Sequence, residues 1–277
     1  MADLLVVEGL SKSYPAGGPF WHRRRASALD AVSIRVGHGR TLGLVGESGS
    51  GKSTLGRCIL GLTRPDSGAI LYDGTEVQGL SGKALADFRR RVQPVFQDPF
   101  GSLDPRWPVG RSVREALDCF RIGTPADRQK RVLDLFSRVG LDPAFATRLP
   151  SELSGGQRQR VAIAAALASE PELIVADEPV SALDMSVQAQ ILNLFMDLQR
   201  DLGVASIFIT HDLGVVEHVS HDIAVLYRGK LVETGPTEAV IHQPQHDYTR
   251  ALLAAIPGRP AVSTSPTIPG SAHSHPR

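Results

Sequence analysis

Residues Gly46 to Ser53 read GESGSGKS, and they decide how the rest of the chain is interpreted. The stretch fits the P-loop pattern of a glycine, four free positions and then Gly-Lys-Ser. Before it, Thr41 to Val45 (TLGLV) is typical of a buried strand, and after it Thr54 to Leu62 has apolar residues at helical spacing. A strand that enters a glycine-rich turn and then a helix directs backbone N–H groups and the positive end of the helix dipole at one point. The stretch therefore predicts a nucleotide-phosphate site.

Each residue type in this loop suits a phosphate. The glycines let the backbone approach the anion and adopt φ values that a Cβ would penalise. Lys52 is placed to reach the outer phosphates, and the Ser53 hydroxyl is placed to ligate Mg²⁺. The alternative is a flexible glycine–serine loop that contains Gly-Lys-Ser by chance, and the flanking strand and helix argue against it. We expect nucleotide contacts from Gly46, Glu47, Ser48, Gly49, Ser50, Gly51, Lys52, Ser53 and Thr54.

Composition narrows the function classes. The 277 residues include 30 Lys and Arg against 29 Asp and Glu, so no overall charge attracts nucleic acid, and we expect no nucleic-acid partner. Two cysteines, Cys58 and Cys119, provide neither a disulfide framework nor a metal cluster. The start, MADLLVVEGL, has no basic leader, and no apolar run reaches the ~18 residues that a membrane span needs. Any membrane role is therefore expected to come through a partner.

Strand and helix patterns alternate along most of the chain, which indicates an α/β fold. Helical patterns cover Lys83 to Arg91 and Val187 to Leu202. From Phe100 to about Pro150 the apolar spacing is helical and no strand is expected, which predicts a helical insertion. After Pro257 the chain is rich in Pro, Ser and Thr, and we expect a disordered tail. Further strands are expected at Leu4 to Leu10, Ala31 to Val36, Ala69 to Tyr72, Val92 to Phe96, Leu173 to Ala176, Ala205 to Thr210, Ile223 to Tyr227 and Lys230 to Glu233.

Polar residues at strand ends are candidates for the chemistry, because strand carboxyl ends face the ligand crevice of an open parallel sheet. Asp177 ends one strand and is a candidate ligand for Mg²⁺, while Glu178 is placed to polarise the attacking water. The alternative is two surface acids. Gln97 and His211 also follow strands, and each either contacts the γ-phosphate or its water or is structural. Tyr14 either stacks on adenine or is an ordinary half-buried tyrosine.

A second candidate anion site lies at Leu153 to Gln157, which reads LSGGQ and precedes an apolar helix. Ser154, Gly155 and Gly156 form an N-terminal nest in which the serine hydroxyl is an added donor. Two phosphate-binding helix starts in one chain indicate either two nucleotide sites or one composite site shared across a dimer.

Taken together, these motifs resemble the ATP-binding-cassette (ABC) ATPases over nearly the whole chain. The P-loop, Gln97, LSGGQ, LIVADE at 173–178, SALD at 181–184 and His211 occur in that family's order. The resemblance implies a P-loop NTPase (RecA-like) core with an antiparallel β subdomain and an inserted α-helical subdomain. It implies ATP and Mg²⁺ as cofactors, with Ser53, Gln97 and Asp177 at the metal and Glu178, His211 and Gln97 in catalysis. In that family two domains pair head to tail, so the implied contacts to the partner's ATP are Ser154, Gly155, Gly156, Gln157 and Asp184.

Three segments are similar to the oligopeptide/dipeptide/nickel importer ATPases: 95–105 (VFQDPFGSLDP), 179–190 (PVSALDMSVQAQ) and 246–257 (HDYTRALLAAIP). The basic loop before Ala28 is similar to the second ATPase of such importers. Val180 stands where that family usually has threonine, and no cysteine follows Cys119, so we predict no iron–sulfur cluster. The resemblance implies a peripheral subunit at the cytoplasmic face of the cell membrane. Its partners would be a second ABC ATPase subunit (identical or different), two transmembrane permease subunits and, through these, an extracytoplasmic substrate-binding protein.

The functional alternative is a soluble ABC-type ATPase not coupled to transport, such as one in phosphonate metabolism. The expected organisation is an ABC ATPase domain at 1–256, with the helical subdomain at about 100–155, and the tail at 257–277. Trp107 in the insertion is either an apolar anchor for the permease or a residue packed inside the insertion. The transported solute cannot be read from this chain, because the permease and the binding protein select it.

Overall fold

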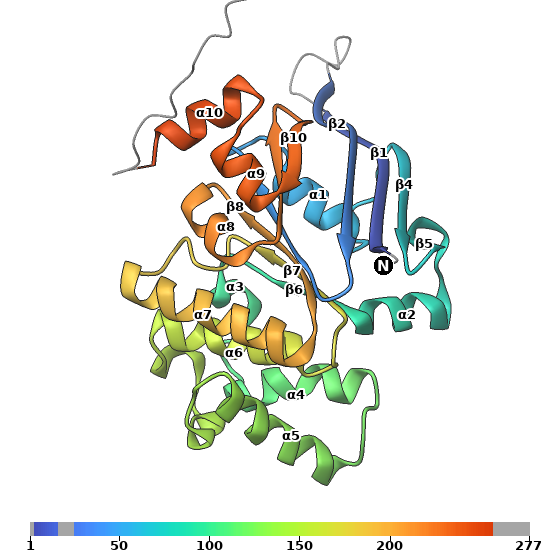
Figure 1. The fold of residues 1–277 in the computed structure, drawn as a ribbon. Helices are drawn as coiled ribbons and strands as arrows, with labels where there is room; N and C mark the ends of the chain where they lie inside the picture. The colour runs from blue at the N-terminus through green and yellow to red at the C-terminus, as the bar shows by residue number, and fades with distance from the viewer. Residues whose placement is uncertain (1–2, 16–24, 257–277) are drawn as a thin grey trace, which may run out of the picture.

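The protein is described here by a computed structural model that covers residues 3–15 and 25–256 (Figure 1). Two sheets organise it. A four-stranded antiparallel sheet has the order β2-β1-β4-β5, and a six-stranded sheet has the order β10-β9-β3-β8-β7-β6. In the larger sheet only β10 is antiparallel to its neighbour. The strands are β1 Asp3–Pro15, β2 Arg25–Gly37, β3 Thr41–Val45, β4 Ser67–Tyr72, β5 Thr75–Glu76, β6 Val92–Val95, β7 Leu173–Asp177, β8 Ala205–Thr210, β9 Asp222–Tyr227 and β10 Lys230–Pro236.

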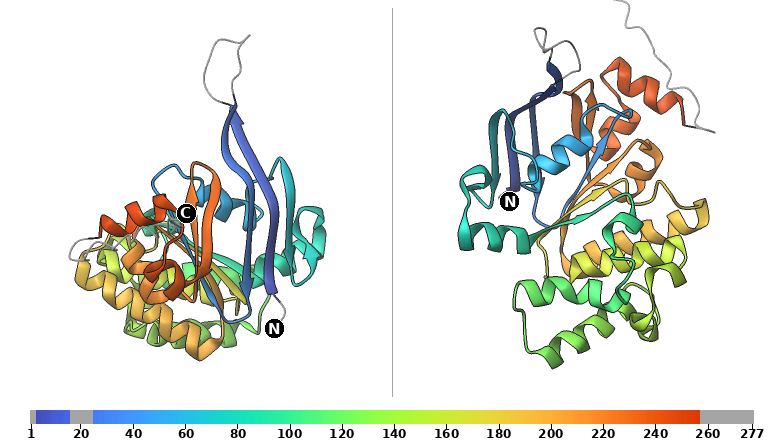
Figure 2. Two further views of the ribbon diagram at one scale, coloured as in Figure 1. Left: turned by 45° about the horizontal axis from the view of Figure 1, so that its top comes forward. Right: turned by 180° about the vertical axis from the view of Figure 1, so that it is seen from behind.

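Helix α1 (Lys52–Ile59) lies between the two sheets, as both views of the ribbon show (Figures 1 and 2). Its buried face, with Leu55 and Ile59, packs in one hydrophobic cluster with Leu29 of the antiparallel sheet and Ile209 of the central sheet. Because α1 follows β3 directly after the P-loop, this packing fixes the loop at the carboxyl end of β3.

Helix α2 joins the first cluster through Phe88, and the later helices form two groups. Helices α4 to α7 share a second hydrophobic cluster, built around side chains such as Phe136 and Phe208, and α3 lies against α6 (green to yellow in Figure 1). Helices α8 to α10 pack in a third cluster with Val45 and Val225 at the far side of the central sheet. Their bounds are α2 Gly82–Arg91, α3 Pro99–Ser102, α4 Val109–Cys119, α5 Pro125–Arg138, α6 Gly155–Leu167, α7 Met185–Leu202, α8 Leu213–Val219, α9 Thr237–His242 and α10 Asp247–Ala254. Among the described residues, no helix has both the length and the apolar character that crossing a membrane requires.

The α/β class and the antiparallel and helical parts agree with the expectations. The strand at 205–210 and that at 41–45 have the predicted bounds, and α1 begins two residues earlier than expected, at Lys52. Tyr14 was expected between strands, but it lies within β1 and pairs with Ala26, because β1 and β2 form a longer hairpin than their apolar cores indicate. Helices α8, α9 and α10 and strand β5 were not predicted. The expected tail at 257–277 lies outside the described residues.

Candidate nucleotide site

The P-loop is shaped by positions that admit only glycine. Gly46 has a φ of +153°, and a Cβ there would lie 2.1 Å from the Leu226 carbonyl oxygen. Gly51 has a φ of +107°, and a Cβ there would lie 2.2 Å from the carbonyl oxygen of Ala28. The loop therefore lies against β2 and β9, too close for any side chain, and its backbone is left to face a ligand.

Lys52 is the first residue of α1 and is almost fully buried, at 4% exposure. Its ammonium donates to the carbonyl oxygens of Gly46 at 2.7 Å and Glu47 at 2.9 Å, so it folds back over the loop. Burial lowers the pKa of Lys52, while the nearby carboxylates of Glu178 and Asp177 act in the opposite direction. A charged amine held by two carbonyl oxygens can exchange them for phosphate oxygens at little cost in solvation.

Ser53 and Asp177 meet beside the loop. The Ser53 hydroxyl donates to Asp177 Oδ1 at 3.1 Å, which joins the first turn of α1 to the end of β7. Burial raises the pKa of Asp177, although the hydrogen bond from Ser53 acts against that change. Two hard oxygen donors thus converge at the sheet edge where the phosphates would lie, which suits Mg²⁺.

Glu178 follows Asp177 in an unusual backbone conformation, with a φ of +47°. Its N–H donates to the Ile209 carbonyl oxygen at 2.9 Å, which holds the residue against β8. Its carboxylate Oε1 lies 3.6 Å from His211 Nδ1, just beyond the end of β8. A non-glycine residue with positive φ is strained and is held by its surroundings, as is often found at functional sites. The structure therefore brings together the two residues that the sequence placed near the attacking water.

Gln97 lies in the exposed connection between β6 and α3, one strand further along the same sheet edge. Along this edge the carboxyl ends of β3, β8, β7 and β6 thus present, in that order, the P-loop, His211, Asp177 with Glu178, and Gln97. Four sequence candidates from distant parts of the chain are placed at one edge by the parallel topology.

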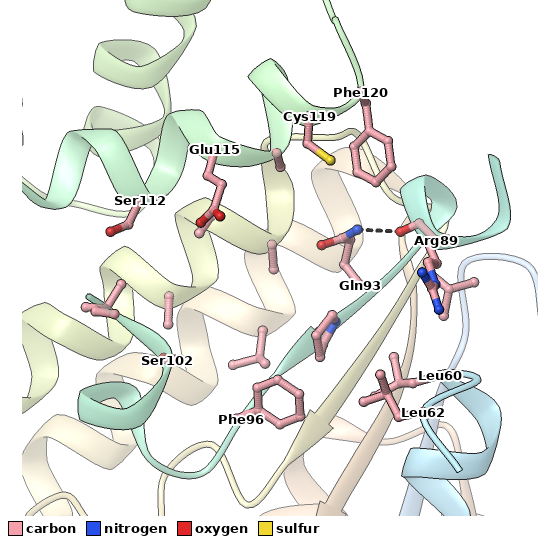
Figure 3. A pocket seen from close by; sticks show the side chains of 18 residues that line it. Leu60, Leu62, Arg89, Gln93, Phe96, Ser102, Ser112, Glu115, Cys119 and Phe120 are labelled. Carbon is pink, nitrogen blue, oxygen red and sulfur yellow. Dashed lines mark hydrogen bonds between the residues drawn. The ribbon is translucent and has the colours of Figure 1, made fainter. Parts of the chain in front are cut away.

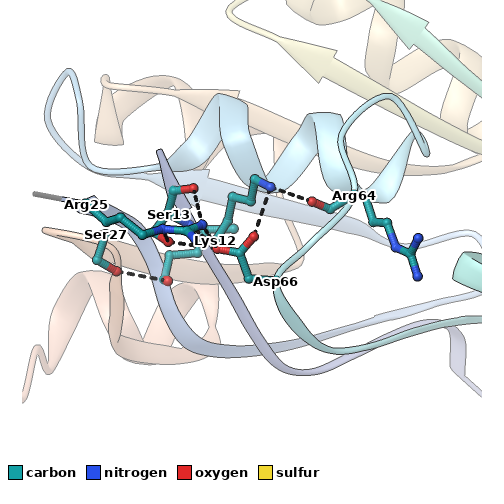
Figure 4. Close-up of polar contacts among 7 residues, drawn as sticks. Lys12, Ser13, Arg25, Ser27, Arg64 and Asp66 are labelled. Atoms are coloured by element: carbon teal, nitrogen blue, oxygen red, sulfur yellow. Dashed lines mark hydrogen bonds and ion pairs between the residues drawn. The ribbon is translucent and has the colours of Figure 1, made fainter. Parts of the chain in front are cut away.

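Tyr14 lies at the outer end of β1 and is 39% exposed, so part of its ring is open to a ligand. Its strand end is held by Asp66, which follows α1 (Figure 4). The Asp66 carboxylate accepts hydrogen bonds from the N–H and hydroxyl of Ser13, from Lys12 Nζ and from Arg25. The two bonds from Ser13 contribute most to lowering the pKa of Asp66 to about 2. This network, which was not anticipated from the sequence, links the strand that carries Tyr14 to the segment after α1.

The LSGGQ segment forms a capped helix start. Ser154 is the N-cap of α6: its hydroxyl accepts from the Gln157 N–H at 3.3 Å, and Gln157 Oε1 accepts from the Ser154 N–H at 2.9 Å. A Cβ on Gly156 would lie 2.5 Å from Val187 Cγ1, so glycine here allows α6 to pack on α7. Asp184 caps α7 by accepting from the Val187 N–H at 3.0 Å. This segment belongs to the hydrophobic cluster of the helical region, whereas α1 belongs to that of the two sheets.

A P-loop, a serine–aspartate pair, an acid beside a histidine and a second capped helix start define a P-loop nucleoside triphosphatase. The family models narrow this class. The model described as "ABC transporter" matches residues 29–181, and the model "Oligopeptide/dipeptide transporter, C-terminal region" matches residues 232–275. The chain belongs to the ABC transporter family, as one of its ATP-hydrolysing ATP-binding proteins.

Individual relatives agree with this family assignment. The chain is 51% identical over 261 residues to the "Probable peptide ABC transporter ATP-binding protein y4tS" of Sinorhizobium fredii, which covers 93% of this chain and 74% of the relative. It is 50% identical over 256 residues to the "Glutathione import ATP-binding protein GsiA" of Salmonella typhimurium, but spans only 41% of that protein. In fold it is similar to the dimeric ATP-binding cassette MJ0796 bound to ADP and Pi, with a TM-score of 0.75, 31% identity and coverage of 84% of this chain and 98% of that one.

These matches identify an importer-type ATP-binding subunit and do not support the alternative of an ATPase outside transport. Sequence reasoning missed two groups of residues near the site. One is the Asp66 network, and the other is Tyr248, whose hydroxyl accepts a hydrogen bond from the P-loop. Tyr248 lies in the HDYTRALL stretch, which carried the resemblance to the importers but was given no role.

Proposed function

We propose that the site hydrolyses MgATP with the residues that the sequence singled out. The observation that carries this proposal is the convergence of Ser53, Asp177, Glu178 and His211 at adjacent strand ends beside the P-loop. Water attacks the γ-phosphorus, the bond to the ADP oxygen breaks, and Glu178 orients the water and accepts its proton. His211, which lies next to Glu178, contacts the γ-phosphate from the end of β8.

Mg²⁺ is held in this proposal by Ser53, Asp177 and Gln97 together with the phosphates. The donor set fits, because Ser53 and Asp177 supply converging oxygens and Mg²⁺ usually binds one or two carboxylates plus substrate phosphates. When bound, the ion neutralises charge on the β- and γ-phosphates. Lys52 contributes a further positive charge once its ammonium moves from the Gly46 and Glu47 carbonyls to the phosphates.

The rest of the nucleotide is assigned to two other regions. Tyr14 stacks on the adenine, with its exposed ring held in place by the β1–β2 hairpin. The loop residues Gly46 to Thr54 surround the phosphates, and the site is completed by Ser154, Gly155, Gly156, Gln157 and Asp184 of a second ABC ATPase subunit. That subunit is either another copy of this chain or a related one. The dimeric cassette to which the fold is similar supports this pairing.

We further propose that hydrolysis drives a separate permease of two transmembrane subunits, at the cytoplasmic face of the cell membrane. The imported solute is a peptide or a related small molecule, delivered by an extracytoplasmic substrate-binding protein. The support comes from the two relatives, a probable peptide ABC transporter ATP-binding protein and a glutathione import ATP-binding protein. In this account residues 1–256 form the ABC ATPase domain, with the helical subdomain at about 100–155.

The permease-docking site in this proposal is a cavity of about 440 Å³ between the central sheet and the helical region (Figure 3). Apolar side chains from both parts face it, including Leu62, Phe96 and Phe120, and Leu62 is 58% exposed. An exposed apolar cavity at the joint of two packed units suits an amphipathic partner helix. Trp107 does not line this cavity, and the Arg111 guanidinium lies 3.8 Å from the centroid of its ring. In this proposal Leu62, Phe96 and Phe120 are therefore the apolar anchors in place of Trp107.

The two cysteines give a direct test of docking. Cys119 is exposed and lines the cavity, whereas Cys58 is buried and its pKa is raised to about 11 by that burial. We expect a maleimide to label Cys119 and leave Cys58 unlabelled in the isolated chain. Labelled protein should keep its basal ATP hydrolysis and lose stimulation by the permease in proteoliposomes. Mass spectrometry of peptides and a phosphate-release assay measure both.

The matched control is Cys119→Ser treated with the same maleimide, which should keep its stimulation. In the assembled transporter Cys119 should be protected from labelling. If Cys119 reacts at the same rate in the free chain and in the complex, and if labelling leaves the stimulation unchanged, the permease docks elsewhere.

A further inference from the structure

Helix α10, the last helix of the described residues, makes a polar contact with the P-loop. The N–H of Glu47, the second residue of the loop, donates to the Tyr248 hydroxyl at 2.9 Å. Tyr248 is the second residue of α10, 201 positions further along the chain. Figure 1 shows α10 in red at the same end of the molecule as the start of α1. Tyr248 itself is not among the residues that bind nucleotide in the proposed function.

The Tyr248 ring is fixed on one side by β9. Its centroid lies 4.1 Å from that of Tyr227, the last residue of β9, with 34° between the ring planes. The turn after β9 also holds the P-loop, because the Gly229 N–H donates to the Ser50 carbonyl oxygen at 2.9 Å. The end of β9 and the turn after it thus support the loop at two points. Gly229 contacts its middle directly, and Tyr227 supports Tyr248, which contacts its beginning.

The segment that leads into Tyr248 is pinned by two charged residues. The Glu233 carboxylate accepts from the N–H groups of Gln245 at 2.7 Å and His246 at 3.0 Å. Arg250 donates to the carbonyl oxygens of Pro244 at 3.2 Å and Gln245 at 2.9 Å. Charge-assisted hydrogen bonds of this kind order a backbone more firmly than neutral ones do. The backbone that leads into Tyr248 is therefore held by β10 and α10, and its ring by β9, without a contribution from the loop.

The Glu47 amide is joined to the part of the loop that holds Lys52. The peptide unit that carries the Glu47 N–H also carries the Gly46 carbonyl, and the Gly46 and Glu47 carbonyls accept the two bonds from Lys52. Since a peptide is planar, a hydroxyl that fixes this N–H also fixes the direction of the Gly46 carbonyl. Without it, the first peptide of the loop could rotate and Lys52 would lose its aligned acceptor.

We infer that Tyr248 is a positioning residue for the P-loop: its hydroxyl holds the Gly46–Glu47 peptide, so that the loop and Lys52 are preformed for the triphosphate. The inference rests on the proposed function, in that it takes this loop as the phosphate site. It gives the region matched by the oligopeptide/dipeptide C-terminal model a part in nucleotide binding, through Glu233, Arg250 and Tyr248.

Tyr248→Phe tests this, because it keeps the ring and its contact with Tyr227 and removes only the hydroxyl. We expect the Kd for mant-ATP, measured by fluorescence titration, to rise about 3- to 10-fold, as for the loss of one hydrogen bond. The KM for ATP should rise by a similar factor with little change in kcat, since binding of the ground and transition states weakens together. The melting temperature of the nucleotide-free chain should stay within about 2 °C of the wild type, a shift that corresponds to a small change in stability.

The matched control is Tyr72→Phe, which removes a tyrosine hydroxyl that donates to Glu172 at 2.7 Å, in a different part of the molecule. It should leave mant-ATP binding unchanged. Glu233→Ala should reproduce the binding defect, and the double variant with Tyr248→Phe should be no weaker than the Tyr248→Phe single, since both act through one contact.

Wild-type mant-ATP affinity in Tyr248→Phe, or equal losses in the two tyrosine variants, would overturn the inference. So would a fully additive double variant. Because binding is measured without turnover, these results are separate from a failure of the proposed function, in which the wild-type chain would bind mant-ATP without hydrolysing ATP.

Discussion

Glu178→Gln is expected to lower steady-state ATP hydrolysis by about 10²- to 10⁴-fold, the usual contribution of a general base. Glutamine keeps the shape of the side chain and its hydrogen-bonding capacity, but it cannot accept a proton from water. The backbone of Glu178 is held by its N–H bond to Ile209, so the substitution should not disturb the positive-φ conformation. Phosphate release under saturating ATP measures the loss.

The same variant should still bind ATP, because Lys52, Ser53 and the P-loop are unchanged. With binding intact and hydrolysis blocked, an ATP-bound dimer should accumulate, which light scattering after gel filtration would detect as a doubled mass. His211→Ala is a useful companion, since it removes the neighbour 3.6 Å from Glu178 and leaves the base in place. Wild-type turnover in Glu178→Gln would remove this residue from the chemistry.

The second large effect is expected from Ser154→Arg. In the proposed function the nest at the start of α6 binds the ATP of the partner subunit, and a long arginine side chain would fill it. We expect hydrolysis to fall by about 10²-fold, since a displacement of about 1 Å between reacting groups has a cost of that size. Binding of mant-ATP to the same chain's P-loop should be nearly unchanged.

Ser154→Ala separates this block from the loss of the helix cap. The Ser154 hydroxyl accepts from the Gln157 N–H, so alanine should cost about 1 kcal/mol of stability without filling the nest. If Ser154→Arg and Ser154→Ala lower the melting temperature alike but only the arginine stops turnover, the arginine prevents the two subunits from closing on the bound ATP. Hydrolysis at the wild-type rate in Ser154→Arg would contradict a shared site.

The core of the fold and the positions of the polar residues at the strand ends could be predicted, because they depend on local pattern. The strands β3 and β8 are buried on both faces and read as short apolar runs, which sets their bounds. Asp177, Glu178 and His211 follow such runs directly, so their common edge follows from the parallel topology. Helix α10, by contrast, has only eight residues, about two turns, which is too short for a helical spacing to be recognised.

The contacts that support the site were not predictable in the same way, because they join residues far apart in sequence. Asp66 meets Ser13 across 53 positions, and Tyr248 meets Glu47 across 201. Each partner alone is an ordinary polar residue, and neither has a spacing that indicates the other. The two pairs are brought together only by tertiary packing, that of α1 between the sheets and that of α10 beside the central sheet.

The most direct test of the shared site is a mixing experiment with Lys52→Ala and Ser154→Arg. Each variant alone should be inactive, the first through its P-loop and the second through its LSGGQ nest. In a mixed pair, the P-loop of the Ser154→Arg chain meets the intact nest of the Lys52→Ala chain. If the two sites act independently, an equal mixture should recover about a quarter of the rate of the isolated wild-type chain, since half the pairs are mixed and each has one intact site. A mixture no more active than its separate components would contradict a site shared between two copies of this chain.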